Sequence, residues 1–211
     1  MRFVCLLFYV LISFPVFAKE NIIILGYQNT IENNKFWQNN QVGFGVKNQL
    51  RDLIFARHDA NILDEKIIDT FNNNTSERLT FNNADQPSWM LQKTEINPQK
   101  LQLFAEQYAL DAIYWVKILN FQKPRSELTI GLWTSKKITK ELTLAICRYS
   151  NAKHNVHCET GKGVSSKRSR AFFYKPVDDK KNRKKHFNHS AIGKISIKAL
   201  EQAFSKLTIR N

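Results

Sequence analysis

The sequence predicts a single α/β domain in which α-helices pack on a mixed β-sheet and a C-terminal helix closes the fold. Short apolar runs alternate with amphipathic stretches in the first half of the chain. A series of strand-like segments follows, and the C-terminal stretch carries apolar residues at helical spacing. This order of elements is typical of one sheet covered by helices.

Each element of the first half has a local signal. Apolar runs without a helical period predict strands, and apolar residues three and four apart predict helices. Asp64 can cap one helix, and Asn97 followed by Pro98 is a typical helix start. The expected elements are a strand at 21–27, a helix at 41–55, a strand at 60–63, helices after Asp64 and after Asn97, and polar loops at 28–41 and 72–94.

The second half predicts a meander of strands and then a helix. Ser190 can cap this last helix, on which Ile192, Ile195, Ala199, Ala203, Phe204 and Leu207 share one face. The strands are expected at 112–121, 127–133, 138–149 and 155–161, and a basic loop at 162–185 connects the last of them to the helix.

Two cysteines in this meander predict a disulfide. A tight loop at 151–154 would pair Ser150 with Asn155, and Cys147 would then lie directly opposite Cys158. Cysteines in that position have side chains on the same face and Cβ atoms close enough to bridge. The alternative is a pair of free buried thiols. Because the two are not a Cys-x-x-Cys pair, we interpret the disulfide as structural.

The first 18 residues are typical of a cleavable secretory leader. Arg2 supplies the positive start, an apolar run extends to Phe17, and cleavage is expected between Ala18 and Lys19. The apolar run has about 15 residues, which is short for a membrane-spanning helix. Cys5 lies too early for lipid attachment. We therefore expect a periplasmic protein whose single domain comprises 19–211, in a compartment where cysteine pairs oxidise.

The mature chain is strongly basic. Loss of the leader removes Arg2 and no acid, so 31 basic residues remain against 18 acidic ones, a net charge of +13. This charge favours an anionic partner such as an acidic protein face, an anionic membrane surface or nucleic acid, of which nucleic acid is the least expected in an exported protein. The anion-binding residues predicted in the basic loop are Lys167, Arg168, Arg170, Lys180, Lys181, Arg183, Lys184 and Lys185. The alternative is a solvated loop that keeps the protein soluble.

Four of the five histidines form two His-x-x-His sets, which could hold zinc or copper. His154 and His157 lie on a predicted hairpin, where residues three apart point to opposite faces of a strand. His186 and His189 lie just before the last helix. We therefore prefer the interpretation that they are polar surface histidines, and we expect no cofactor. The sequence lacks a nucleophile elbow, a phosphate-binding loop and a His-Glu-x-x-His motif.

Several segments resemble the periplasmic fold of the curli secretion component family and of the lipoprotein activators of penicillin-binding proteins. The chain is also similar to the N-terminal domain of the Tol–Pal system's propeller protein. The resembling segments are 22–29, 43–46, 62–68, 105–113 and the Gly161-Lys162-Gly163 triplet. The resemblance implies a binding or assembly role at the outer envelope, with possible oligomers. The family's lipidated cysteine and its barrel-forming hairpins are not evident.

Together these patterns predict a non-enzymatic envelope protein that binds a protein partner as an assembly or accessory factor. Two alternatives remain open. One is a metal-dependent hydrolase that uses the histidine sets, and the other is a basic protein that binds anionic membranes or nucleic acid.

Overall fold

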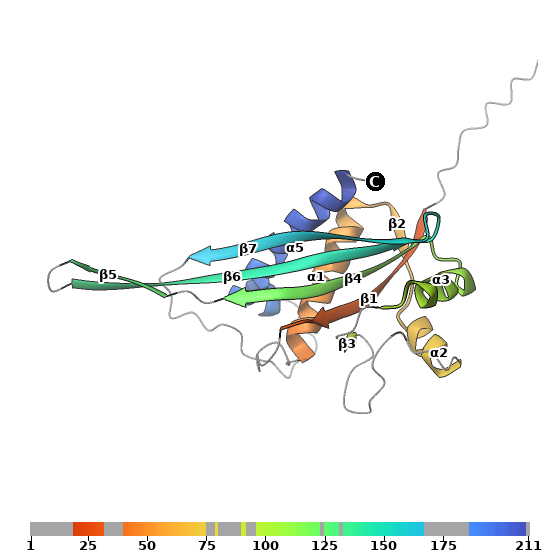
Figure 1. Ribbon diagram of the computed structural model, residues 1–211, viewed down its shortest axis with the longest axis horizontal. Coiled ribbons are helices and arrows are strands. Elements are labelled where there is room, and N and C mark those ends of the chain that lie inside the picture. Colours follow the sequence, from red (N-terminus) through yellow and green to blue (C-terminus); the bar gives the residue numbers. More distant parts are fainter. Residues whose placement is uncertain are drawn as a thin grey trace, which may run out of the picture.

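The fold is one mixed β-sheet with helices on both faces (Figure 1). The computed structural model describes residues 19–31, 40–74, 79, 90–91, 96–122, 125–130, 133–166 and 186–209. The predicted fold class, including the closing C-terminal helix, is confirmed. No helix among these residues is sufficiently long and apolar to cross a membrane.

The sheet is parallel on one side and antiparallel on the other. β1 (Glu20–Asn29) pairs in parallel with β2 (Ala60–Ile62), β3 (Met90–Leu91) and β4 (Ala112–Gln122). β6 (Trp133–Ser150) pairs antiparallel with β4 on one side and with β7 (Asn155–Ser166) on the other. β1 is therefore central and buried, as its apolar sequence predicts.

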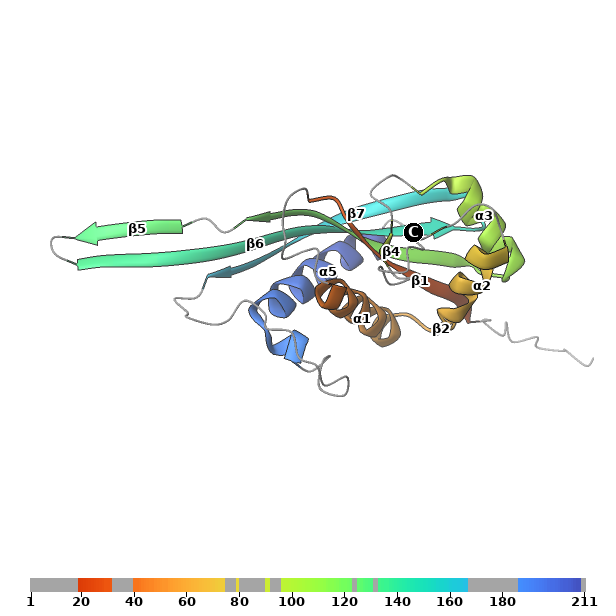
Figure 2. The ribbon, with the colours of Figure 1, turned by 90° about the horizontal axis from the view of Figure 1, so that it is seen from below.

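One face of the sheet is covered by α1 (Asn40–Arg57) and α5 (Ala191–Ile209), which lie side by side (Figure 2). The Ser190 hydroxyl accepts the Gly193 N–H at 3.0 Å, which confirms the predicted cap of α5. The six residues predicted to share the inner face of α5 are all buried. They pack with Val46 and Leu50 of α1 into the larger of the two core clusters.

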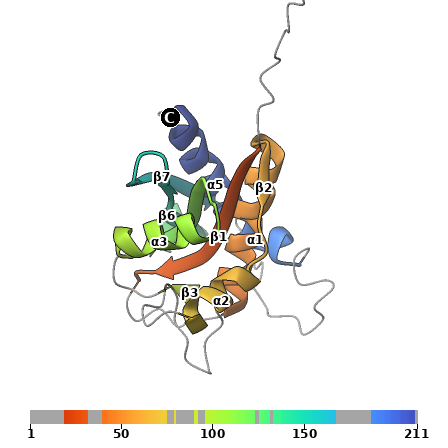
Figure 3. The ribbon, with the colours of Figure 1, turned by 90° about the vertical axis from the view of Figure 1, so that its right-hand side faces the viewer.

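The opposite face carries α2 (Lys66–Asn74) and α3 (Pro98–Gln107). Figure 3 shows α3 and α1 on either side of β1. Both predicted caps are confirmed, because the Asp64 carboxylate accepts the Lys66 N–H and the Asn97 side chain accepts the Gln99 N–H. These short helices cover only the end of the sheet around Ile113, Trp115 and Cys147.

A long hairpin extends beyond this two-sided core. β5 (Arg125–Ile130) pairs with the first six residues of β6 in the register that β4 has with β6 at Asn120–Gln122, after the register shift that follows Ile118. β5 therefore continues β4, and together they run along one side of β6. The paired segments 125–130 and 133–138 project past the helices as a two-stranded arm (Figure 1).

Several predicted boundaries are wrong. Trp133 begins β6 instead of ending the preceding strand, and residues 134–137 belong to β6 instead of a loop. The expected basic loop starts too early, because β7 continues through Ser166. The predicted loop at 28–41 includes the end of β1 and the start of α1. The predicted loop at 72–94 includes the last residues of α2 and the short strand β3. At 134–137 and 162–166 the strands carry mostly polar residues, which the apolar patterns used to predict strands do not detect.

The start of β1 is fixed by charged side chains. Glu20 accepts hydrogen bonds from His58 and, at 2.5 Å, from Arg148, while Lys19 pairs with Asp59 at 2.7 Å. Burial raises the pKa of Glu20, but the hydrogen bonds from His58 and Arg148 lower it by more, so this pKa lies below its usual value. The ionised Glu20 carboxylate therefore stabilises the fold at pH values above the pKa that Glu20 has in the unfolded chain. That contribution is lost as the pH falls through the lower pKa of the folded state.

A buried lysine joins α1 to the segment between β2 and α2. Lys47 is only 2% exposed, and its Nζ lies 2.5 Å from an oxygen of Glu65, which is partly exposed. Burial lowers the pKa of Lys47 from its usual 10.5, and the nearby Glu65 carboxylate opposes that shift. The native state therefore holds this proton less tightly than the unfolded chain does.

We expect a Glu65→Ala variant to lose about 2 kcal/mol of unfolding free energy at neutral pH, because it leaves the Lys47 ammonium buried without its carboxylate. The loss should shrink as pH rises toward 10.5, because Lys47 then releases its proton in the folded state first. Urea unfolding at several pH values measures both effects. In a Lys47→Met background the Glu65→Ala change should cost little, and an equal cost in both backgrounds would contradict this account.

Candidate interaction surface

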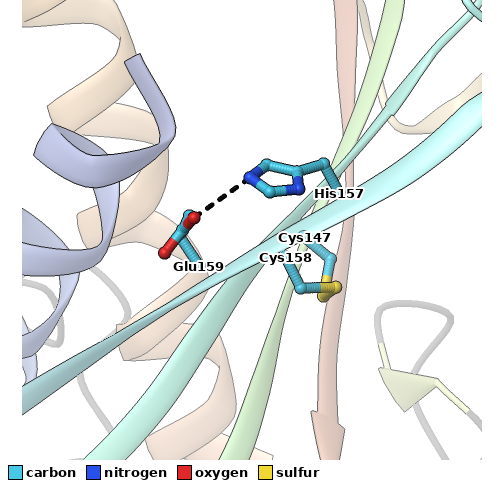
Figure 4. The surroundings of a disulfide bond; sticks show 4 residues. All are labelled: Cys147, His157, Cys158 and Glu159. Atoms are coloured by element: carbon cyan, nitrogen blue, oxygen red, sulfur yellow. Dashed lines mark hydrogen bonds and ion pairs between the residues drawn. A yellow bond between two sulfur atoms is a disulfide. The ribbon is translucent and has the colours of Figure 1, made fainter. Parts of the chain in front are cut away.

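The predicted disulfide joins β6 to β7 (Figure 4). Ser150 pairs with Asn155, and Cys147 lies opposite Cys158 with a Cα–Cα distance of 4.0 Å. The sequence-based register and the disulfide are both confirmed. Cys147 is fully buried beneath α3, whereas Cys158 is exposed. The disulfide thus joins the exposed face of β7 to the covered part of the sheet.

The face of β7 that carries Cys158 is exposed along the strand. Val156, Cys158, Thr160, Lys162 and Val164 alternate along this face, and all five are exposed. The residues between them face α5, which lies so close that Gly161 and Gly163 have no room for a side chain. β7 therefore has one tightly packed face and one open face.

The open face continues across the neighbouring strands with polar side chains. The exposed Lys162 pairs with Glu141 of β6, which is partly exposed, at 2.7 Å. Thr143 is partly exposed, and Asn120 and Gln122 of β4 are exposed. We call this surface the open sheet face; it comprises Asn120, Gln122, Glu141, Thr143, Thr160, Lys162 and Val164. Hydroxyl, amide and charged groups on an exposed sheet surface suit recognition of another surface.

The outer edge of β7 is blocked at its centre. The backbone N–H of Lys162 donates to the Gln202 side chain at 2.6 Å, and Lys206 Nζ donates to the Thr160 carbonyl at 2.8 Å. These groups point away from β6 and would otherwise be open to an incoming strand. No sequence pattern distinguishes Gln202 and Lys206, because only the register of α5 against β7 shows their role. A partner therefore meets the open sheet face more readily than the middle of this edge.

The basic stretch begins directly after β7. Lys167, Arg168, Arg170, Lys180, Lys181, Arg183, Lys184 and Lys185 all lie outside the described residues. Their role in anion binding stays a prediction. Ser166, the last residue of β7, pairs with Thr139 at the base of the projecting arm. β7 therefore ends beside the open sheet face and at the base of the arm.

The structure does not bring the two histidine sets together. His154 lies in the turn between β6 and β7, and His157 pairs with Glu159 at 3.1 Å (Figure 4). His186 and His189 lie in a helical turn before α5, at the end of the helix that packs near Gly163. Within the described ranges no three His, Cys, Asp or Glu side chains are grouped to hold a metal ion.

No protein-family model matches this chain, and no curated protein matches it. Among solved structures, the hypothetical protein CT253 from Chlamydia trachomatis is 10% identical with a TM-score of 0.46, covering 90% of this chain and 96% of that chain. Lipoprotein GNA1162 from Neisseria meningitidis is 10% identical with a TM-score of 0.43, covering 71% and 85%. The LpoB C-terminal domain from Salmonella enterica is 8% identical with a TM-score of 0.40, covering 72% and 87%.

At these TM-scores the likeness is loose. The resemblance to the curli secretion component family and to penicillin-binding protein activators therefore stays a prediction.

Proposed function

We propose that this protein is a non-enzymatic factor of the bacterial envelope that binds an acidic surface of a protein partner. The binding surface consists of the open sheet face and the basic stretch that follows it. The observation that carries the proposal is β7, which is fixed to β6 by a disulfide and is packed against α5 on one face, while its other face, which carries Cys158, is exposed. A rigid exposed face of this kind is suited to docking.

The disulfide and the leader support the envelope location. Disulfides persist in oxidising compartments such as the bacterial periplasm. Residues 1–18 have the three-part pattern of an exported precursor. The positive charge of the mature chain supports an anionic partner, because complementary charge speeds encounter and excludes partners of like charge.

Site-specific photo-crosslinking in cells tests the docking face. A photoreactive residue at Thr160 or Val164 should crosslink to one protein, identified by mass spectrometry, because these positions lie on the open sheet face. The same residue at Lys198, which is exposed on α5, should not capture that protein. Equal capture from all three positions would contradict the proposed surface.

Charge neutralisation tests the basic stretch. Replacing five of its residues by glutamine should reduce capture of that partner by about tenfold or more, because several charge pairs at the interface are lost together. A control with the same net charge replaces five exposed residues elsewhere and should retain capture. The test set is Lys180, Lys181, Arg183, Lys184 and Lys185, and the control set is Arg51, Lys66, Lys153, Lys194 and Lys198. If both sets of substitutions reduced capture of the partner equally, net charge alone would explain the effect, and a specific role of the basic stretch would be contradicted.

A further inference from the structure

The outer surface of α1 carries the most exposed large apolar side chain among the described residues. Phe55 is 78% exposed, compared with 57% for Leu103 on α3 and 39% for Ile197 on α5. It lies one helical turn after Arg51, which is also exposed, whereas Leu50 on the inner side of the helix is fully buried. Single apolar residues are common on protein surfaces, so the meaning of Phe55 depends on what surrounds it.

Ile197 adds apolar surface from the neighbouring helix. Gln49 Nε2 donates to the Gly193 carbonyl at 2.9 Å. Two turns further along both helices, Arg57 pairs with Glu201 at 3.9 Å. α1 and α5 therefore run side by side in the same direction (Figure 2). Because Ile197 is one turn from both Gly193 and Glu201, it lies on the side of α5 that faces α1, and the helix pair exposes apolar surface from both helices.

The helices that carry these two apolar side chains are basic. The exposed charged residues of α1 and α5 are five basic and two acidic ones, namely Arg51, Arg57, Lys194, Lys198 and Lys206 against Asp52 and Glu201. On the opposite face of the sheet, α2 and α3 carry two of each sign, namely Lys66 and Lys100 against Asp69 and Glu106. We call the outer surface of α1 and α5 the helical face; it comprises Arg51, Phe55, Lys194, Ile197 and Lys198.

We propose that the helical face docks on a bilayer that contains anionic phospholipids. The Phe55 ring would enter the headgroup region, and the surrounding lysine and arginine side chains would contact lipid phosphates. Lysine is depleted at protein–protein interfaces, whereas basic residues around exposed apolar side chains are typical of helices that lie on membrane surfaces. The composition of the helical face therefore favours a bilayer over a protein surface.

The helical face and the open sheet face lie on opposite sides of the sheet. Thr160, Lys162 and Val164 point away from α5, whereas Gly161 and Gly163 lie directly against it. Docking through the helical face would therefore turn the open sheet face away from the bilayer and toward a partner. The inference does not depend on the proposed function, because it uses a different surface and its tests need only purified protein and lipid.

Vesicle co-sedimentation of the purified chain 19–211 tests the apolar contribution. The wild type should bind vesicles of phosphatidylcholine and phosphatidylglycerol more tightly than vesicles of phosphatidylcholine alone. Phe55→Ser should weaken binding to the mixed vesicles about tenfold, because the burial of a phenylalanine ring is lost. Leu103→Ser is the matched control, because it removes an exposed apolar side chain from the opposite face of the sheet. Absence of wild-type binding, or equal affinities of the two variants, would overturn the proposal.

Paired lysine substitutions test the charge contribution. Lys194→Gln/Lys198→Gln should weaken binding to the mixed vesicles about tenfold, because each lysine near an anionic surface contributes to binding. Lys66→Gln/Lys153→Gln removes the same charge from exposed positions outside the helical face and should bind like the wild type. If the two double variants bound equally, net charge alone would account for the binding and docking through the helical face would be excluded.

A fluorophore shows which surface meets the lipid. An environment-sensitive dye on a Phe55→Cys variant should shift its emission to shorter wavelength when the mixed vesicles are added, whereas the dye on Leu103→Cys should not. The shift at position 55 should persist when Lys180, Lys181, Arg183, Lys184 and Lys185 are replaced by glutamine. Its loss in that background, or an equal shift at position 103, would contradict docking through the helical face. Capture of the protein partner is a separate measurement, so the two proposals can fail independently.

Discussion

The free energy of unfolding of a Gly161→Val variant is expected to be about 3 kcal/mol lower than that of the wild type. A Cβ at this position would lie 1.9 Å from the Ala199 carbonyl oxygen and 2.8 Å from the Ala203 nitrogen. Both obstacles are backbone atoms of α5, so no side chain can rotate to make room. The helix has to shift, and the buried contacts of Phe204 and Leu207 shift with it.

Lys162→Ala is the matched control, because it changes the residue between the two close glycines. The Lys162 side chain points to the open sheet face and its main contact is the exposed pair with Glu141. Exposed ion pairs contribute about 0–1 kcal/mol, so this variant should retain nearly all of its stability. Urea unfolding followed by circular dichroism compares the two. If Gly161→Val and Lys162→Ala lowered the free energy of unfolding by the same amount, the close approach of α5 would not explain why residue 161 is glycine.

Reduction of the Cys147–Cys158 disulfide is expected to cost about 2–3 kcal/mol of unfolding free energy. The two cysteines are 11 residues apart, so the crosslink closes a short loop in the unfolded chain. The fold should persist after reduction, because the β6–β7 ladder and the packing of α5 on Gly161 and Gly163 remain. Exposure of Cys158 should let reductant reach the bond without global unfolding.

Denaturant unfolding with and without reductant measures this cost. A Cys147→Ala/Cys158→Ala variant is the control, and reductant should leave its midpoint unchanged. If the wild type, with its disulfide verified by mass, showed the same midpoint with and without reductant, the crosslink would not stabilise the native hairpin.

Local signals predicted much of this fold. The cap at Asn97 and the tight turn after Ser150 are set by a few neighbouring residues, so the helix start and the Cys147–Cys158 pairing could be derived from the sequence. The stripe of apolar residues on α5 likewise marks its buried face. In each case the residues that decide the structure are adjacent or lie one helical turn apart.

The features that the sequence did not show depend on distant contacts. Residues 134–137 carry no apolar alternation, yet they lie in β6 because β5 pairs with them. The Gly161-Lys162-Gly163 triplet resembles a family motif, but the physical reason for its glycines is the close approach of α5, which only the packed structure shows. Gln202 and Lys206 resemble any exposed helix residues until the edge of β7 is placed beside them.

The most direct test of the envelope role is the form of the protein isolated from fractionated cells. We expect the periplasmic fraction to contain a chain that starts at Lys19, with Cys147 and Cys158 resistant to alkylation until a reductant is added. N-terminal sequencing and mass spectrometry of alkylated peptides report both properties. Recovery of the protein solely from the cytosol, starting at Met1 with both of these thiols alkylated, would contradict the proposed location, the oxidised hairpin and the role that depends on them.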